Sequence, residues 1–184
     1  MAVAGTDVYF AGLNNYHAVY WKNGTEYSLP VTSNPNYSMV NAIAISGTDV
    51  YFAGLDGQQA VYWKNGVETA LPYATGSTYS TITAIAISGT DVYFAGVDFR
   101  SAVYWKNGVE TILPLTNSSN SFSAVVGMTT NGTDVYIAGY EGTDNISTNS
   151  SYFIPEYWKN GAVKALPVTN SGGGTVSALA VVTQ

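Results

Sequence analysis

The sequence has little of what most catalytic sites are built from. It contains no cysteine and a single histidine, His17, among 184 residues. The absence of cysteine excludes a disulfide framework and thiolate chemistry, although it is neutral about the compartment in which the protein works. One imidazole in a polar loop cannot form a histidine-based metal cluster, and it offers a triad only one candidate base. We therefore expect no enzyme, no metal site and no cofactor.

Carboxylates leave one catalytic alternative open, because glycoside hydrolysis needs two of them at a set separation. Acidic residues outside the repeated turns could supply such a pair, but no spacing among them singles one out. These residues are Asp56, Asp98, Glu141, Asp144 and Glu156.

Positive charge is also scarce. Six Lys and Arg residues stand against twelve Asp and Glu residues, which gives a formal net charge of −6. Binding a nucleic-acid backbone requires clustered Lys and Arg, so nucleic acid is excluded as a partner. No apolar run approaches the roughly 20 residues of a membrane-spanning helix, so we expect no membrane insertion. The start "MAVAGTDVYF" has neither a basic region nor a long apolar region, so no secretory leader is predicted.

What the sequence does have is a repeat. The letters "GTDVYFAG" occur at residues 5–12, 47–54 and 89–96, and "GTDVYIAG" occurs at 132–139. The tryptophans keep the same step until the fourth unit, which is longer because of the segment "YEGTDNISTNSSYFIPE". A period near 40 residues is typical of repeat architectures. We divide the chain into repeats at about 1–39, 40–81, 82–122 and 123–176, followed by a closing strand at 177–184, all in one domain.

Each repeat contains four short runs with strand character. In the second repeat they cover residues 41–46, 50–54, 60–65 and 67–72, and Asn65-Gly66 is a strong hairpin signal between the last two. Val61 and Trp63 should face one side of their strand, and Ala60 and Tyr62 the other. Both faces are therefore apolar, as in a sheet held between two neighbours. We predict an all-β β-propeller of four-stranded antiparallel blades, with a solenoid as the main alternative.

The order "AIAIS–GTD–VYFAG–AVYWKNG" is similar to the strand order of WD40-type propellers. Over nearly its whole length the chain resembles the "DVYxAG…YWKNG" repeats of bacterial β-propeller proteins. It lacks the Trp-Asp dipeptide and the repeated histidine of true WD40 repeats. The resemblance implies an extracellular or cell-surface protein and specifies no activity.

The repeats leave one strand in excess. The run "SALAVVT" (177–183) would open a fifth unit, while Met1–Ala4 matches the end of the same strand before the first unit. We expect the last strand to close the ring by pairing with Val8–Gly12, of the same chain or of another. Four blades would stand at about 90° to one another and eight at about 45°, and packed sheets prefer small angles. We therefore favour a homodimer with an eight-bladed ring over a four-bladed monomer.

The turns of such a blade alternate between two rims. The "SGTD" and "KNG" turns share one rim, here called the turn rim, and are nearly the same in every repeat. The loops after "VYFAG" and after "LP" share the other, here called the variable rim. Loops on a rigid scaffold usually carry recognition, so we expect a non-enzymatic interaction module that binds a protein or peptide through the variable rim. The alternative is a multivalent, lectin-like carbohydrate binder.

Candidate ligand-binding residues lie on the variable rim. Four residues at one equivalent position offer a side-chain oxygen, and aromatic residues stand nearby, a combination that suits neutral sugars. The same oxygens could instead stabilise turns. Because the aromatic residues do not repeat at one offset, we favour the protein or peptide partner. The candidates are Asn14, Tyr16, Asp56, Asp98, Phe99, Arg100, Tyr140 and Glu141. The "GTD" aspartates and the lysines before Asn-Gly are interpreted as turn residues, with an anion site at the lysines as a lesser alternative.

Overall fold

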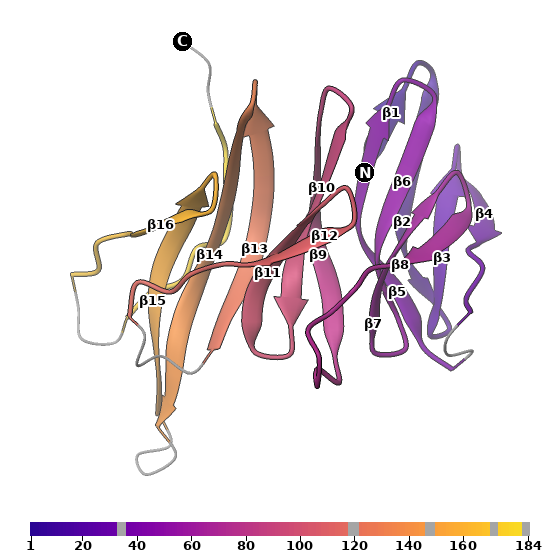
Figure 1. Cartoon of the computed structure of the whole chain (residues 1–184). Helices are drawn as coiled ribbons and strands as arrows, with labels where there is room; N and C mark the ends of the chain where they lie inside the picture. The colour runs from indigo at the N-terminus through magenta and orange to yellow at the C-terminus, as the bar shows by residue number, and fades with distance from the viewer. Residues whose placement is uncertain (33–35, 118–121, 146–149, 170–172, 182–184) are drawn as a thin grey trace.

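The fold consists of four antiparallel sheets of four strands each (Figure 1). The computed structural model describes residues 1–32, 36–117, 122–145, 150–169 and 173–181. In these ranges there is no helix, and therefore none that could cross a membrane.

Each sheet follows the chain order of its strands. The first sheet comprises β1 (Ala2–Ala4), β2 (Asp7–Asn14), β3 (His17–Lys22) and β4 (Thr25–Ser28). The second comprises β5 (Ser38–Ser46), β6 (Asp49–Asp56), β7 (Gln59–Lys64) and β8 (Val67–Ala70). The third comprises β9 (Ser80–Ser88), β10 (Asp91–Asp98), β11 (Ser101–Lys106) and β12 (Val109–Ile112). The fourth comprises β13 (Phe122–Asn131), β14 (Asp134–Asn145), β15 (Ser150–Lys159) and β16 (Ala162–Ala165).

The four strands predicted from the second repeat are confirmed, although the first begins earlier, at Ser38, and the last ends earlier, at Ala70. The hairpin signal is also confirmed: Asn65 has φ 51° and Gly66 has φ 84°, as a turn with two left-handed residues requires. His17 begins β3, so its placement in a loop was wrong.

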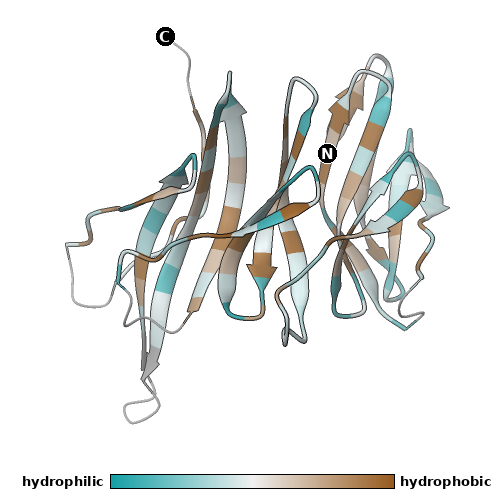
Figure 2. Ribbon diagram, viewed as in Figure 1, coloured by the Kyte–Doolittle hydropathy of each residue, from teal (hydrophilic) through white to brown (hydrophobic). Residues whose placement is uncertain are grey.

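The sheets pack face to face in chain order, and each interface has its own apolar core. Val61 and Trp63 pack with Phe52 against the first sheet, whereas Ala60 packs with Ala53 against the third. Both faces of the second sheet are therefore covered, as predicted. Figure 2 shows the corresponding apolar bands along the strands.

Polar contacts repeat at every interface in addition to the apolar ones. Trp63 Nε1 donates to the Pro30 carbonyl at 2.7 Å, and equivalent bonds of 2.7 Å join Trp105 to Pro72 and Trp158 to Pro114. These three tryptophans are fully buried. A tryptophan therefore anchors each sheet to the loop that leaves the sheet before it.

The row of sheets is open in this structure. Extensive contacts join only consecutive sheets, and among the described residues no comparable contact joins the first sheet to the fourth. The two sheets stand at opposite ends of the row in Figure 1. Residues 177–181 of the expected closing strand belong to no strand, and Val8 pairs with Val3 of β1. The arrangement is consistent with a propeller, but ring closure is not part of it.

Candidate functional site

The loops of the variable rim meet at one end of the sheets. The backbone N–H of Ser38 donates to the Tyr16 carbonyl at 2.9 Å. Ser80 N donates to the Gln58 carbonyl at 2.8 Å in the same way, one interface further along. These hairpin tips are thus held against the end of the loop that follows their own sheet. Phe99 N in turn donates to the Tyr79 carbonyl at 2.7 Å, which ties its hairpin tip to the loop that precedes the third sheet.

Three of the four predicted side-chain oxygens are buried. Asp56 and Glu141 are 0% exposed, and Asp98 is 4% exposed. Thr32 N donates to Asp56 Oδ2 at 3.0 Å, and Ala74 N donates to Asp98 Oδ2 at 2.8 Å. These carboxylates therefore hold the loop of the preceding sheet in place.

Asn14, at the same position of the first sheet, is exposed. Its amide donates to both carboxylate oxygens of Glu26, at 3.0 and 3.1 Å. The equivalent position thus joins sheets only where a sheet precedes it in the row.

In the second and third sheets a second acid, Glu68 or Glu110, accompanies the buried carboxylate, and the sequence analysis did not single out these two glutamates. Burial, and then the charge of Asp98, raise the pKa of Glu110 to about 7. Burial, and then Asp56, raise the pKa of Glu68 in the second sheet. The repeated "VET" could have revealed these two glutamates. Its glutamate lies opposite the buried tryptophan, as Glu68 does opposite Trp63.

The fourth sheet builds its acid pair differently. Glu156 on β15 is 0% exposed, and burial, followed by the charge of Glu141, raises its pKa to about 8. Glu141 accepts a hydrogen bond from the Thr116 hydroxyl and one from Asn117 N at 3.0 Å. The Glu141 carboxylate therefore accepts hydrogen bonds from the preceding loop, whereas Glu156 lies in surroundings that favour its neutral form.

The predicted aromatic and cationic residues fall into two groups. Tyr16 is 65% exposed and Phe99 is 61% exposed, both at hairpin tips. Tyr140 is half-buried and packs edge-on against Phe153, with ring centroids 5.4 Å apart. Arg100 lies with its guanidinium carbon 5.7 Å from the centre of the Phe122 ring. Of the three aromatic candidates, Tyr16 and Phe99 therefore present their rings to solvent and Tyr140 does not.

A pocket of about 250 Å³ opens beside Phe99. The loop after β8 forms one wall, and Ser77 of that loop donates its hydroxyl hydrogen to Asp98 at the base of the pocket. Phe99 and Ile112, which is 58% exposed, supply apolar surface. The lining residues are Ala74, Thr75, Gly76, Ser77, Asp98, Phe99, Ser101 and Ile112.

The turn rim carries the same charged cluster in all four sheets. In the second sheet Lys64 Nζ lies 2.7 Å from Asp49 Oδ2 and 5.3 Å from the centre of the Tyr51 ring. The Asn65 amide donates to the other Asp49 oxygen at 2.8 Å. Lys64, followed by Asn65, lowers the pKa of Asp49. The lysines are therefore paired with turn aspartates, which supports the interpretation of both as turn residues. The other ion pairs are Lys22–Asp7, Lys106–Asp91 and Lys159–Asp134.

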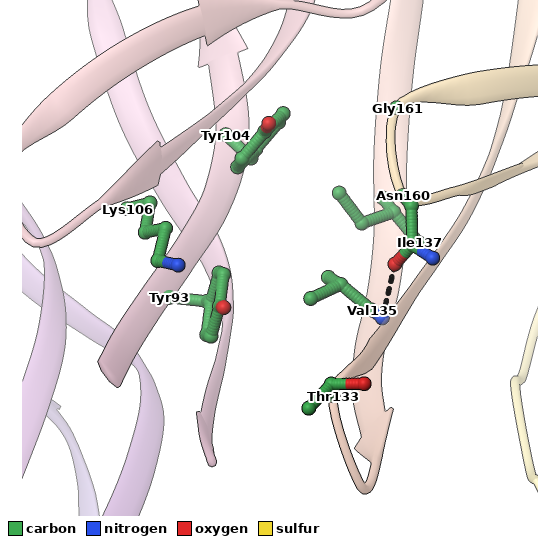
Figure 3. Close-up of a pocket in the computed structure, with 8 residues that line it drawn as sticks. All are labelled: Tyr93, Tyr104, Lys106, Thr133, Val135, Ile137, Asn160 and Gly161. Carbon is green, nitrogen blue, oxygen red and sulfur yellow. Dashed lines mark hydrogen bonds between the residues drawn. The ribbon is translucent and has the colours of Figure 1, made fainter. Parts of the chain in front are cut away.

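A second kind of pocket lies at the turn rim, between consecutive sheets. Figure 3 shows the one between the third and fourth sheets, where Tyr93, Tyr104 and Lys106 face Val135 and Ile137 across about 210 Å³. An equivalent pocket of about 260 Å³ lies between the second and third sheets, with Tyr51, Tyr62 and Lys64 in the same roles. The two tyrosines and the lysine recur at fixed offsets in the sequence, which is the signal that could have revealed these pockets.

No protein-family model matches the chain, and no curated protein is significantly similar to it in sequence. Within the described ranges no group of three or more His, Cys, Asp or Glu side chains is arranged to hold a metal ion.

Proposed function

We propose that this protein is a non-enzymatic interaction module whose variable rim binds a protein or peptide partner. The sheets would act as blades of a β-propeller and serve as a rigid support for the loops. The observation that carries this proposal is Phe99, an exposed aromatic residue with φ 55°.

The left-handed conformation of Phe99 closes the turn between β10 and β11, but it is costly for a residue with a side chain, and the turn does not need an aromatic ring. The second sheet has Gly57, with φ 63°, at the equivalent turn position. A residue with a Cβ is disfavoured in the left-handed region by roughly 1–2 kcal/mol, and an exposed ring gains nothing from burial. Residues with strained backbone conformations are frequent at binding sites, where contact with a partner offsets the strain.

The surroundings of Phe99 suit an apolar side chain carried on a peptide. Phe99 and Ile112 give the pocket apolar walls, and the loop 74–77 lines it with small and polar residues. Interaction surfaces of this type are enriched in aromatic anchors, which contribute most of the binding energy. We therefore expect a partner segment with at least one large apolar residue.

Selection of peptides from a displayed random library on the purified chain tests this function. Phe99→Gly, which introduces the residue of the second sheet, should weaken the selected peptide at least about tenfold, as expected for an aromatic anchor. It should also raise thermal stability, because glycine tolerates the positive φ. Val109→Thr is the matched control: Val109 is 69% exposed on β12, and Thr25 takes its place in the first sheet. Failure to select any peptide, or equal affinity for Phe99→Gly and the control, would contradict the proposal.

A multivalent carbohydrate-binding function is the second candidate. The variable-rim carboxylates predicted to bind sugar are buried. The turn-rim pockets, however, offer the same tyrosine and lysine groups at each of two interfaces. Aromatic faces with nearby hydrogen-bonding groups suit sugars. A glycan array probed with the wild type and with a Lys64→Gln, Lys106→Gln double variant tests it. Binding that the double variant retains in full would exclude these pockets as the site.

A further inference from the structure

The two ends of the row expose complementary halves of one interface. On the first sheet Phe10 is 49% exposed, whereas its equivalents Phe52 and Phe94 are each 2% exposed. Trp21 is only half-buried, and in the described part of the chain its indole N–H has no hydrogen-bond partner, unlike that of Trp63. The face that every other sheet turns toward its predecessor is therefore uncovered here.

The fourth sheet exposes the other half of this interface, the face that each earlier sheet turns toward its successor. Phe52 stacks on Tyr20 of the preceding sheet, and Phe94 stacks on Tyr62, each with ring centroids 4.7 Å apart. Tyr157 takes the corresponding place on β15 and stacks on no ring among the described residues. A first sheet placed on a fourth sheet would repeat the contact already made inside the chain.

The first strand of the first sheet, β1, covers less of its neighbour than β5 does in the second sheet. β5 pairs with β6 from Asp49 to Asp56, whereas β1 pairs only with Asp7–Tyr9 of β2. Among the described residues, no strand pairs with residues 11–14 of β2 on that side. The unfilled stretch matches residues 38–42 of β5, which pair with Ala53, Gly54, Leu55 and Asp56.

Residues 177–181 fit that stretch. Their sequence "SALAV" aligns with "SMVNA" at 38–42, and Leu179 lies against Gly127 of β13. This is where the first strand of a following sheet would pack, because β5, β9 and β13 contact one another in succession. In Figure 1 the segment runs beside β13 toward the C-terminus. Its backbone makes no ladder with any described strand, which leaves its edges open for pairing.

Gly12 gives an independent indication. A Cβ at Gly54 would overlap the Met39 carbonyl oxygen, so the β-bulge of β5 requires glycine there. A Cβ at Gly12 would meet nothing closer than a Trp21 ring atom at 4.0 Å. The glycine becomes necessary once a strand equivalent to β5 lies beside it.

We propose that a second copy of this chain completes the first sheet with its residues 177–181. The register places Ser177 of the second copy opposite Asn14 and Leu179 of the second copy opposite Gly12, and Phe10 stacks on Tyr157 of the second copy. Each chain does this for the other. Two copies make eight blades, within the usual range of about four to eight, whereas three copies exceed it.

This inference rests on the propeller arrangement proposed above and is independent of what the variable rim binds. Light scattering on the intact chain therefore tests it separately from peptide binding. We expect twice the mass of one chain. The mass of a single chain, or of more than two, would overturn the proposal.

Gly12→Val tests the register. Valine suits a strand, and in the single chain the position is open, so the variant should fold and give an unchanged β-sheet circular dichroism spectrum. It should weaken association at least about tenfold, because the new side chain would meet the incoming carbonyl oxygen. Thr25→Val, the residue found at the equivalent Val67, is the matched control and should remain dimeric. A Gly12→Val variant that dimerises as tightly as the control would disprove the proposed pairing.

Cysteine cross-linking identifies which chain supplies the strand. The chain has no cysteine of its own, so Leu13→Cys and Ala178→Cys can be made separately and refolded together. A disulfide-linked dimer that forms only in the mixture would support exchange between chains. Its absence, together with an internal disulfide in the double variant, would assign the strand to the same chain and overturn the proposal.

Discussion

The inner sheets and the end sheets show that a side chain's place in the row decides its burial as much as its identity does. The first and second sheets share the sequence "GTDVYFAG", yet Phe10 is 49% exposed and Phe52 is 2% exposed. Because the residues are the same, the difference comes entirely from the presence of a preceding sheet. A single repeat cannot bury both of its faces, and its neighbours supply the rest of its core.

The fourth sheet differs from the inner sheets in sequence as well as in position. Glu156 stands where the inner sheets have Val61 and Val103, and Val163 stands where they have glutamate. Pro155 replaces an alanine whose N–H donates to a buried serine in the earlier repeats, as Ala60 does to Ser80 at 2.8 Å. The last sheet thus cannot make the backbone-to-serine hydrogen bond of the earlier repeats, and it has an acid where they have a core valine.

The largest expected effect contrasts an inner tryptophan with the end one. Trp105→Ala removes a fully buried ring and its bond to Pro72, and should lower the free energy of unfolding by about 3–5 kcal/mol. Trp21→Ala should cost less than about 1 kcal/mol in a single chain. Urea unfolding of both variants in the Gly12→Val background, which keeps the end face open, measures the difference. Equal losses would mean that Trp21 is buried in solution without a second copy.

The next effect contrasts two glycines of identical sequence context. Gly54→Ala should destabilise the fold by about 1–3 kcal/mol, because the added methyl group overlaps the Met39 carbonyl oxygen. Gly12→Ala should change stability by less than about 0.5 kcal/mol, since its position is open. Thermal unfolding of both variants at a protein concentration too low for association would measure this contrast. A loss for Gly12→Ala as large as that for Gly54→Ala would show that the first sheet is already completed within one chain.

The regular part of the fold could be predicted from the sequence because its signals are local. The alternation in "AVYWKN" and the Asn65-Gly66 turn depend on neighbouring residues only, and both gave correct strands. The end of the row could not be predicted in the same way. Whether Val8 pairs with β1 or with residues 177–181 depends on which strand reaches that edge, and the local pattern fits both.

The candidate site was harder to predict than the fold for a similar reason. Asp56 ends β6 and Phe99 directly follows β10, so both stand beside a short hairpin loop and their sequence surroundings look alike. The structure buries Asp56 under the loop of the preceding sheet and leaves Phe99 61% exposed. That difference depends on contacts between repeats, as do the pockets between sheets.

The smallest expected effect concerns the acid that distinguishes the fourth sheet. The pKa of Glu156 is raised to about 8 in the folded protein from an ordinary 4.5, so the folded state holds a proton that the unfolded chain releases. The stability contributed by the neutral acid is complete below about pH 4.5 and is lost progressively as the pH rises to about 8. Glu156→Gln keeps the neutral form at every pH, so its stability relative to the wild type should rise by at least about 1 kcal/mol between pH 4.5 and pH 8.5. Guanidinium unfolding at the two pH values gives the comparison, and taking the difference between variant and wild type cancels the titration of Glu110. A constant difference across this range would show that Glu156 is ionised in the folded protein and that water or a cation reaches it.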